Sequence, residues 1–231
     1  KAGSFPKNKF IEPIFNGLSN ELVMLLNELF WWLHIIGILI FMNYLYYSKH
    51  LHILLAFPNT YFADLNPKGQ LSNLESVTNE VKLMMDPNAD PYATPVIDEN
   101  AVPSKFGASD IQDLNWVQLM NAYTCTECGR CTSACPANIT GKKLSPRKIM
   151  MATRDRIEEV GKNIDTNKGV FVPDNKTLLN DYITPEELWA CTSCNACVEE
   201  CPVNISPLSI IIDLRRYLVM EQSTAPNALN A

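Results

Sequence analysis

The sequence lacks most of the residue patterns on which enzymes build a catalytic site. It contains no G-x-G-x-x-G fingerprint of a dinucleotide-binding fold, no P-loop and no signature of a hydrolase triad. None of its eight cysteines lies outside two short runs, so no thiol remains for nucleophilic catalysis. Positive charge is not in excess, since 19 lysines and arginines stand against 25 aspartates and glutamates, which argues against bulk binding of nucleic acid. We therefore assign no catalytic residue to this chain.

The eight cysteines stand in two copies of one twelve-residue pattern. The copies are CTECGRCTSACP at residues 125–136 and CTSCNACVEECP at residues 191–202. The pattern C-x-x-C-x-x-C-x-x-x-C-P is the run of thiolates that holds a [4Fe-4S] cluster, and in two-cluster proteins its fourth cysteine ligates the other cluster. The sequence therefore predicts two [4Fe-4S] clusters.

The spacing also assigns the ligands of each cluster. Three cysteines at intervals of three residues can hold three corners of one cubane, whereas the fourth cysteine cannot reach the same cubane. Cluster 1 is expected to take three ligands from the first run and one from the second: Cys125, Cys128, Cys131 and Cys201. Cluster 2 is expected to take the complementary set: Cys191, Cys194, Cys197 and Cys135.

Two other uses of the cysteines fit the spacing less well. Disulfides need an oxidising compartment. Zinc usually takes two C-x-x-C pairs rather than a triplet followed by a distant fourth cysteine. Two complete runs that each end in Cys-Pro favour clusters over both alternatives.

One long apolar run, LFWWLHIIGILIFMNYLYY, occupies residues 29–47. At 1.5 Å of rise per residue a helix of this run would be about 28 Å long, which is close to the hydrocarbon thickness of a bilayer. The sequence predicts a transmembrane helix over about residues 22–55. A buried helix of a soluble core is the alternative. A signal peptide fits poorly, because the run is long and no small-residue cleavage site follows it.

Two of the three histidines, His34 and His52, are candidate ligands of haem iron. On a helix that runs on past Tyr47, their spacing of five full turns would place both on one face, with levels about 27 Å apart. A titratable side chain in a membrane span is a functional hypothesis by default, and two such histidines suit axial ligation of two b-type haems. The alternative is that His34 makes a helix–helix hydrogen bond and His52 lies at the interface. Two bis-histidine haems need further ligands, which are expected from helices upstream of this sequence or from another subunit.

The chain is predicted to be mainly α-helical and to have four segments. These are a membrane anchor at 1–57, a proline-rich linker at 58–108, an α-helical ferredoxin domain at 109–220 and a flexible tail at 221–231. Within the linker, SVTNEVKLMM at 76–85 is a short helical candidate. The ferredoxin domain is an internal repeat, because a helix leads into each cysteine run, and Asn-Ile and then Ser-Pro precede a second helix.

Capping signals predict where the helices of this domain begin. Ser109 and Gln112 have capping-box spacing ahead of the first cysteine run. Thr184 with Glu187 marks another start, directly before the second run. The stretch 161–182, which begins with Gly161, is predicted to be a loop.

Both the cysteine-run region and the apolar segment resemble parts of known protein families. The helices around CTECGRCTSACPANI and CTSCNACVEECPVNI resemble the α-helical ferredoxin domains of heterodisulfide reductase small subunits, anaerobic glycerol-3-phosphate dehydrogenase and succinate dehydrogenase iron–sulfur subunits. WWLHIIGILIFMNYLYYSKHLHILLAFPN resembles the last helix of nitrate reductase gamma-like anchors. In this order, the two pieces resemble membrane-bound iron–sulfur oxidoreductases related to heterodisulfide reductase and to electron-transfer-flavoprotein:menaquinone oxidoreductase. The resemblance implies that His34 and His52 match haem-ligand positions.

Chemistry and resemblance together imply an electron-transfer subunit of a multi-subunit oxidoreductase. Electrons are expected to pass through two [4Fe-4S] clusters between a soluble redox partner and the quinone pool of a respiratory chain, with haem b as a further carrier. Substrate conversion is expected on a partner, a CCG-domain or flavoprotein subunit. The alternatives are a membrane-tethered iron–sulfur redox sensor and a structural anchor of a respiratory complex.

The expected location is the inner (cytoplasmic) membrane, with the cluster domain facing the cytoplasm. Lys49 follows the apolar run closely, and cluster assembly needs reducing conditions. Lys7 and Lys9 favour the opposite orientation but lie farther from the run. A group of basic residues near the first cysteine run would either steer an acidic redox partner or form a solvated helix face: Lys142, Lys143, Arg147, Lys148, Arg154 and Arg156.

Overall fold

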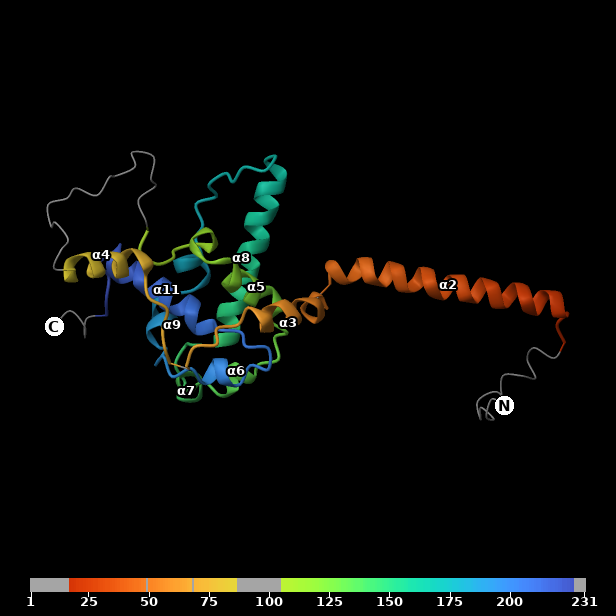
Figure 1. The fold of residues 1–231 in the computed structure, drawn as a ribbon, viewed down its shortest axis with the longest axis horizontal. Coiled ribbons are helices and arrows are strands. Elements are labelled where there is room, and N and C mark those ends of the chain that lie inside the picture. Colours follow the sequence, from red (N-terminus) through yellow and green to blue (C-terminus); the bar gives the residue numbers. More distant parts are fainter. Residues whose placement is uncertain (1–16, 49, 68, 87–104, 227–231) are drawn as a thin grey trace. The chain divides into compact units, whose positions relative to one another are not determined.

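Helices make up the regular structure of the chain in the computed structural model, which describes residues 17–48, 50–67, 69–86 and 105–226 (Figure 1). These residues contain no β-strand, so the prediction of a mainly α-helical fold is confirmed. The chain divides into two compact units, Lys1–Leu51 and His52–Ala231.

The first unit contains one long helix, α2 (Asn20–Tyr46). It begins at the N-cap Ser19, whose hydroxyl oxygen accepts a hydrogen bond from the backbone N–H of Leu22 at 3.4 Å. At 1.5 Å of rise per residue the helix is about 40 Å long. None of its residues is buried, and it is long and apolar enough to cross a membrane. A helix that is apolar all round must bury its surface against something outside itself.

The predicted continuation of this helix to about residue 55 is wrong, because α2 ends at Tyr46. The backbone N–H of Tyr47 donates to the carbonyl of Tyr44 at 3.1 Å, which tightens the last turn. The hydroxyl of Ser48 donates to the Leu45 carbonyl at 3.0 Å, so a side chain takes a bond that a continuing helix would have made with its backbone. Lys49 lies outside the described residues.

A separate helix, α3 (Leu51–Tyr61), follows and belongs almost entirely to the second unit. His34 and His52 are therefore on different helices, and their spacing along the sequence does not place them on one helical face. The buried side chain of Asn59 donates from Nδ2 to the carbonyl of Val203 at 2.8 Å. This bond holds the end of α3 to the loop after the second cysteine run.

The predicted linker at 58–108 is thus attached to the cluster domain at its beginning. Beyond α3, the guanidinium of Arg216 donates to the backbone carbonyl of Ser72. The helix expected at 76–85 is present as α4 (Glu75–Met85). The later prolines of the linker, from 87 to 103, lie outside the described residues.

The rest of the second unit is built from short helical pieces around two longer helices. In chain order these elements are η1 (Ile111–Asp113), α5 (Trp116–Thr124), α6 (Arg130–Ser133), α7 (Pro136–Ile139), α8 (Pro146–Thr166), η2 (Leu178–Tyr182), α9 (Pro185–Trp189), α10 (Ala196–Glu199) and α11 (Pro207–Met220). α8 contacts both α5 and α11, so the helices that follow the two cysteine runs share one core.

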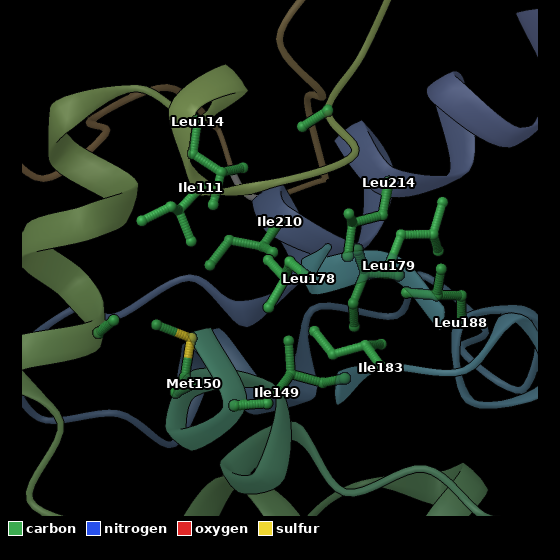
Figure 2. Packing of buried hydrophobic residues seen from close by; sticks show 14 of the residues in the cluster. Ile111, Leu114, Ile149, Met150, Leu178, Leu179, Ile183, Leu188, Ile210 and Leu214 are labelled. Atoms are coloured by element: carbon green, nitrogen blue, oxygen red, sulfur yellow. The ribbon is translucent and has the colours of Figure 1, made fainter. Parts of the chain in front are cut away.

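Apolar side chains from both halves of the repeat form that core (Figure 2). Ile149 and Met150 come from α8, and Ile210 and Leu214 come from α11. Figure 2 shows them beside Leu178 and Leu179 of η2, and all six are at most 1% exposed. Burial of one such side chain stabilises a fold by about 1.5–3 kcal/mol, so the core joins the two halves firmly.

Three of the predicted helix starts are confirmed. Ser145 and Ser206 are the N-caps of α8 and α11, and each is followed by proline at the first helical position. Thr184 and Glu187 form a reciprocal capping box at α9, with side-chain to backbone bonds of 3.4 and 3.0 Å.

The predicted cap at Ser109 and Gln112 is wrong. The carboxylate of Asp113 accepts bonds from the backbone N–H and the hydroxyl of Ser109, at 2.8 and 3.0 Å, so Ser109 is a donor here. The N-cap of η1 is the next residue, Asp110, and a second box formed by Asn115 and Gln118 begins α5. Asp and Asn are as good at the N-cap as Ser. Asp110 and Asn115 are the caps here because each forms a reciprocal capping box with the residue three positions later.

Helix α8 also continues through Gly161 to Thr166, so the predicted loop begins six residues later than expected. A single glycine inside a helix costs only about 1 kcal/mol, which tertiary packing of α8 offsets. The fully buried guanidinium of Arg156 also attaches α8 to the segments that hold Asp110 and Asp174. It donates to Asp110 at 2.7 and 3.0 Å and to Asp174 at 2.5 and 3.0 Å.

The segment before η1 lies directly against α11. Gly107 has φ +80°, and a Cβ added there would be 2.4 Å from the carbonyl oxygen of Asp213, so only glycine fits. The backbone N–H of Phe106 donates to the carboxylate of Glu221 at 2.8 Å. Glu221 stands in the expected flexible tail, 221–231, yet this contact attaches it to the cluster domain; residues 227–231 lie outside the described residues.

Candidate iron–sulfur site

The two cysteine runs lie close together in the folded domain. The short helices that follow their first cysteines, α6 and α10, contact each other. All eight cysteines are free thiols. A disulfide framework is therefore not what holds the two runs together.

A cavity beside these helices is lined by cysteines of both runs. Cys125, Cys128 and Cys131 of the first run line it together with Cys201, the last cysteine of the second. These are the four cysteines that the spacing assigns to cluster 1. Cys197, from the set assigned to cluster 2, also lines this cavity.

The pKa values of the thiols indicate which cysteines are neighbours. Burial raises the pKa of Cys125, and the nearby Cys131 and Cys201 raise it further. Burial likewise raises the pKa of Cys191, where the cysteines that add to the effect are Cys135 and Cys194. Each run is thus electrostatically coupled to the last cysteine of the other run.

Cys197 is the most strongly affected thiol. Burial first, and then the neighbouring Cys191, Cys131, Cys135 and Cys194, raise its pKa to about 12. Thiolates crowded in this way repel one another unless cations lie between them. Binding of iron needs the deprotonated thiolates and supplies that positive charge, so the donor set fits an iron cluster.

The loops between the cysteines have left-handed residues at the same two positions in both runs. Glu127 and Ser193 have φ of +59° and +55°, and Gly129 and Asn195 have φ of +81° and +60°. In each loop the two left-handed residues flank a cysteine, and tight turns of this kind can direct backbone N–H groups to one side, which favours binding of negative charge. The backbone N–H of Ser193 donates to the Sγ of Cys191 at 3.4 Å, as this geometry requires.

The last cysteine of the second run has a similar contact. The backbone N–H of Ile205 donates to the Sγ of Cys201 at 3.4 Å. Hydrogen bonds to sulfur are one means by which a protein tunes the potential of a cluster. The loops are therefore suited to holding charged sulfur.

The site does not resemble a site for a single metal ion. Within the described part of the chain, no three side chains of His, Cys, Asp or Glu converge as ligands of one ion would. A structural zinc ion needs four ligands within about 2.3 Å of one point. A cubane spreads its four ligands over its corners, which agrees with cysteines that surround a cavity.

Two arginines lie beside the cysteine loops, and no motif in the sequence pointed to this role. Arg154 forms an ion pair with Glu127, and it acts against the larger effect of burial on the pKa of Cys125. Arg215 donates to the backbone carbonyl of Cys191 at 2.5 Å. Each arginine stands eight residues after the proline of its Ser-Pro pair, so alignment of the two repeats could have found them.

The expected basic patch is largely neutralised. Arg156 is fully buried and Arg154 is paired, so neither belongs to an exposed patch. Lys143 and Lys148 form ion pairs of 2.8 and 2.5 Å with carboxylates of α9. These contacts favour the alternative of a solvated helix face over a surface that steers a partner.

The two histidines lie away from the cysteine runs in the sequence and on separate helices. His34 is exposed on α2, and His52 is partly buried near the start of α3. The structure therefore provides no common helical face for two haem ligands.

Comparison with known proteins agrees with this site. Residues 124–205 match the model of the 4Fe-4S dicluster domain, which includes both cysteine runs. The chain is 33% identical over 221 residues to a probable iron-sulfur-binding oxidoreductase, FadF, of Bacillus subtilis, covering 83% of this chain and 28% of that protein. It is 27% identical to the EtfAB:quinone oxidoreductase of Syntrophomonas wolfei, covering 92% of this chain and 29% of that protein.

A third relative is one subunit of the ferredoxin/F(420)H(2)-dependent CoB-CoM heterodisulfide reductase of Methanosarcina acetivorans. It is 32% identical over 107 residues, which are 46% of this chain and 52% of the relative. The resemblance to iron–sulfur oxidoreductases of this kind is confirmed by these homologues. The chain spans less than a third of the length of the first two relatives. No solved structure matches the chain.

Proposed function

We propose that this chain is the membrane-anchored, electron-carrying part of an oxidoreductase that works between a soluble redox partner and quinone. The observation that carries the proposal is the cavity in which three cysteines of the first run meet the last cysteine of the second. Such cross-ligation joins two clusters in one small domain. A [4Fe-4S] cluster, when bound, takes up or releases one electron, so a pair of them suits a relay.

The proposed ligand sets are those given by the spacing. Cluster 1 is held by Cys125, Cys128, Cys131 and Cys201, and cluster 2 by Cys191, Cys194, Cys197 and Cys135. The chain's own contribution is to hold these thiolates at fixed positions, to donate backbone N–H groups to their sulfurs and to limit water. Buried Met150 and Ile205 form part of the wall of the cavity at cluster 1.

Anchoring in the membrane rests on α2. Its large apolar side chains are exposed on every side, for example Phe30, Leu33 and Ile40 at 60–65%. Transfer of this surface from water to lipid is favourable, and its length suffices to cross the hydrocarbon region. We place α2 in the inner (cytoplasmic) membrane and the cluster domain on the cytoplasmic side, where reducing conditions allow clusters to assemble.

The proposal of quinone as an electron partner rests on the relatives. The proposal of a separate substrate-converting partner rests on the sequence, in which we assigned no catalytic residue. One relative is named as an EtfAB:quinone oxidoreductase, which supports quinone as one electron partner. Substrate conversion is placed on a further domain or subunit, of the flavoprotein or CCG-domain kind. Haem b is a further proposed carrier with His34 and His52 as candidate ligands, and it now rests on the family resemblance alone.

The test is an anaerobic redox titration of the chain in mild detergent, followed by low-temperature EPR and optical spectra. We expect about eight iron atoms per chain and two interacting [4Fe-4S] signals. Split b-type absorption in the same titration would support the haem. Its absence would indicate that His34 and His52 have structural roles.

Single substitutions test the ligand sets. Cys131→Ser and Cys201→Ser are each expected to remove the same cluster signal, and Cys135→Ser is expected to remove the other. Ser133→Ala, within the same run, is the matched control and should leave both signals. Loss of the same signal from Cys201→Ser and Cys135→Ser would contradict the cross-ligation.

Electron flow separates the proposal from its alternatives. With a chemically reduced soluble donor and a quinone analogue, the wild-type chain in vesicles should reduce the quinone, and Cys131→Ser should not. A redox sensor or a structural anchor predicts the same slow rate for both proteins.

A further inference from the structure

The two halves of the cluster domain place an arginine at the same position. Each half continues from its cysteine run to a Ser-Pro pair and a helix, and the eighth residue after the proline is Arg154 on α8 and Arg215 on α11. Both side chains reach back to the loop that carries the first three cysteines of their own run. The two arginines are therefore equivalent in the repeat.

The charge of Arg154 is neutralised on the loop of the first run. Its side chain is only 16% exposed and forms an ion pair with Glu127, whose side chain is 24% exposed. Glu127 stands two residues after Cys125 and donates its backbone N–H to that cysteine's sulfur. A positive and a negative charge thus lie together beside cluster 1.

Among the residues that the structure describes, the groups that accept hydrogen bonds from Arg215 are neutral. Its N–H groups donate to the backbone carbonyls of Cys191 and Leu188, each at 2.5 Å, and to the hydroxyl of Ser193 at 3.4 Å. Its guanidinium lies 5.0 Å from the centre of the Trp189 ring. Across residues 105–226 and the described parts of the N-terminal half, no carboxylate forms an ion pair with Arg215.

One loop position accounts for the difference between the halves. Ser193 stands two residues after Cys191, as Glu127 stands two residues after Cys125. Both residues are left-handed, with φ of +55° and +59°, and both donate a backbone N–H to the sulfur of the first cysteine. The repeat therefore has a carboxylate at this position in one half and a hydroxyl in the other.

We propose that this position sets the two reduction potentials unequally: Arg215 raises the potential of cluster 2, whereas Glu127 cancels the equivalent effect of Arg154 on cluster 1. Reduction adds an electron to a group that already carries thiolate charge, so a nearby cation favours the reduced state. The inference rests on the ligand sets of the proposed function, and it is independent of the membrane and of quinone.

Other charges near cluster 1 do not alter the comparison. Arg130, Arg147 and Glu200 line the same cavity, but all three are exposed, and water and salt screen such charges. Their contribution is the same in the wild-type chain and in every variant described below. The variants therefore report on the loop position alone.

The test measures both potentials by EPR-monitored redox titration of the full chain in mild detergent. Glu127→Gln keeps the shape of the side chain and removes its charge, so it should raise one of the two potentials. We expect about a tenfold change in the one-electron equilibrium, which corresponds to about 59 mV.

Ser193→Glu introduces the missing carboxylate within reach of Arg215, and it should lower the other potential by a similar amount. The equivalent loop already holds a glutamate at the same backbone angles, so this substitution requires no new conformation. Arg215→Gln should lower the same potential that Ser193→Glu lowers. The double variant Glu127→Ser, Ser193→Glu should shift the two potentials in opposite directions.

Asp165→Asn is the matched control for Glu127→Gln. It removes one negative charge from the exposed end of α8, about 16 Å along the helix axis from Arg154. Equal shifts from Glu127→Gln and Asp165→Asn would overturn the proposal. Shifts of the same potential by Glu127→Gln and Ser193→Glu would also overturn it.

Iron content separates this inference from the function on which it rests. If wild type and variants all hold about eight iron atoms per chain and the potentials do not move, the ligand sets stand and the charge inference fails. If the wild-type chain does not assemble two clusters, the ligand sets fail, and the inference fails with them.

Discussion

The two longest described helices, α2 and α8, differ in how much of their surface is buried. α2 has no buried residue along its whole length, whereas α8 buries seven residues in the core of the cluster domain. α8 is amphipathic, with charged residues on its outer face, and its partners are supplied by the chain itself. α2 is apolar all round, and this chain leaves it exposed. The difference teaches that the second unit is stabilised by its own core, whereas the apolar surface of α2 has no partner among the described residues and needs one outside them.

Lysines placed in the middle of α2 should have the largest effect, because they would remove the affinity of α2 for lipid without changing the cluster domain. Ile36→Lys combined with Ile40→Lys puts two charges where the bilayer centre is expected, at a cost of about 2.5–3.5 kcal/mol for each. The variant should leave the membrane fraction in flotation assays while its iron content stays unchanged. Thr166→Lys, at the exposed end of α8, is the control and should remain with the membrane. Retention of the double variant would indicate that α2 is not a span.

Removal of the buried guanidinium should have the next largest effect, and only on the second unit. Arg156→Leu leaves the carboxylates of Asp110 and Asp174 without their partner, which costs about 3–5 kcal/mol for a buried pair. Chemical denaturation followed by loss of the cluster absorption should show this destabilisation. Arg154→Leu, two residues earlier, removes a more exposed pair and should destabilise less.

A pair of leucine-to-alanine substitutions compares the buried core of the second unit with the exposed surface of α2. Leu214→Ala on α11 empties space in the core, where its side chain is fully buried, and should destabilise the cluster domain by about 2–5 kcal/mol. Leu39→Ala on α2, where the side chain is 55% exposed, should leave the unfolding of the cluster domain unchanged. A similar loss in both variants would contradict the independence of the two units.

The smallest expected effect is a dependence of stability on pH. Hydrogen bonds from Arg156 lower the pKa of Asp174 to about 2, below its ordinary value of 3.8. A lowered carboxyl pKa contributes stability that is complete above about pH 4 and is lost as the pH falls through about 2. The difference in unfolding free energy between wild type and Asp174→Asn should therefore shrink over this range. A difference that stayed constant down to pH 2 would show that the ion pair contributes nothing.

The outcomes of the sequence predictions follow the range of the interactions involved. The caps at Ser145, Thr184 and Ser206 depend on residues within four positions of each other, and these predictions agree with the structure. The end of α2 also depends on neighbours, but the hydroxyl of Ser48 competes with the helix backbone there, and apolar periodicity does not register such a competition. The continuation of α8 past Gly161 needed knowledge of its packing, which offsets the cost of glycine.

By itself, the sequence determined the chemistry of the cysteines, the repeat that contains them and the existence of one long apolar helix, because each is written in residue type and local spacing. Only the tertiary structure decided which distant groups form ion pairs and hydrogen bonds with each other. Glu127 meets Arg154 across 27 residues, and Asn59 meets Val203 across 144, so neither pairing leaves a local pattern. Such contacts form when the common core of α8 and α11 brings the two repeats together. The same packing places Arg154 and Arg215 at equivalent positions, where Glu127 faces the one and Ser193 faces the other.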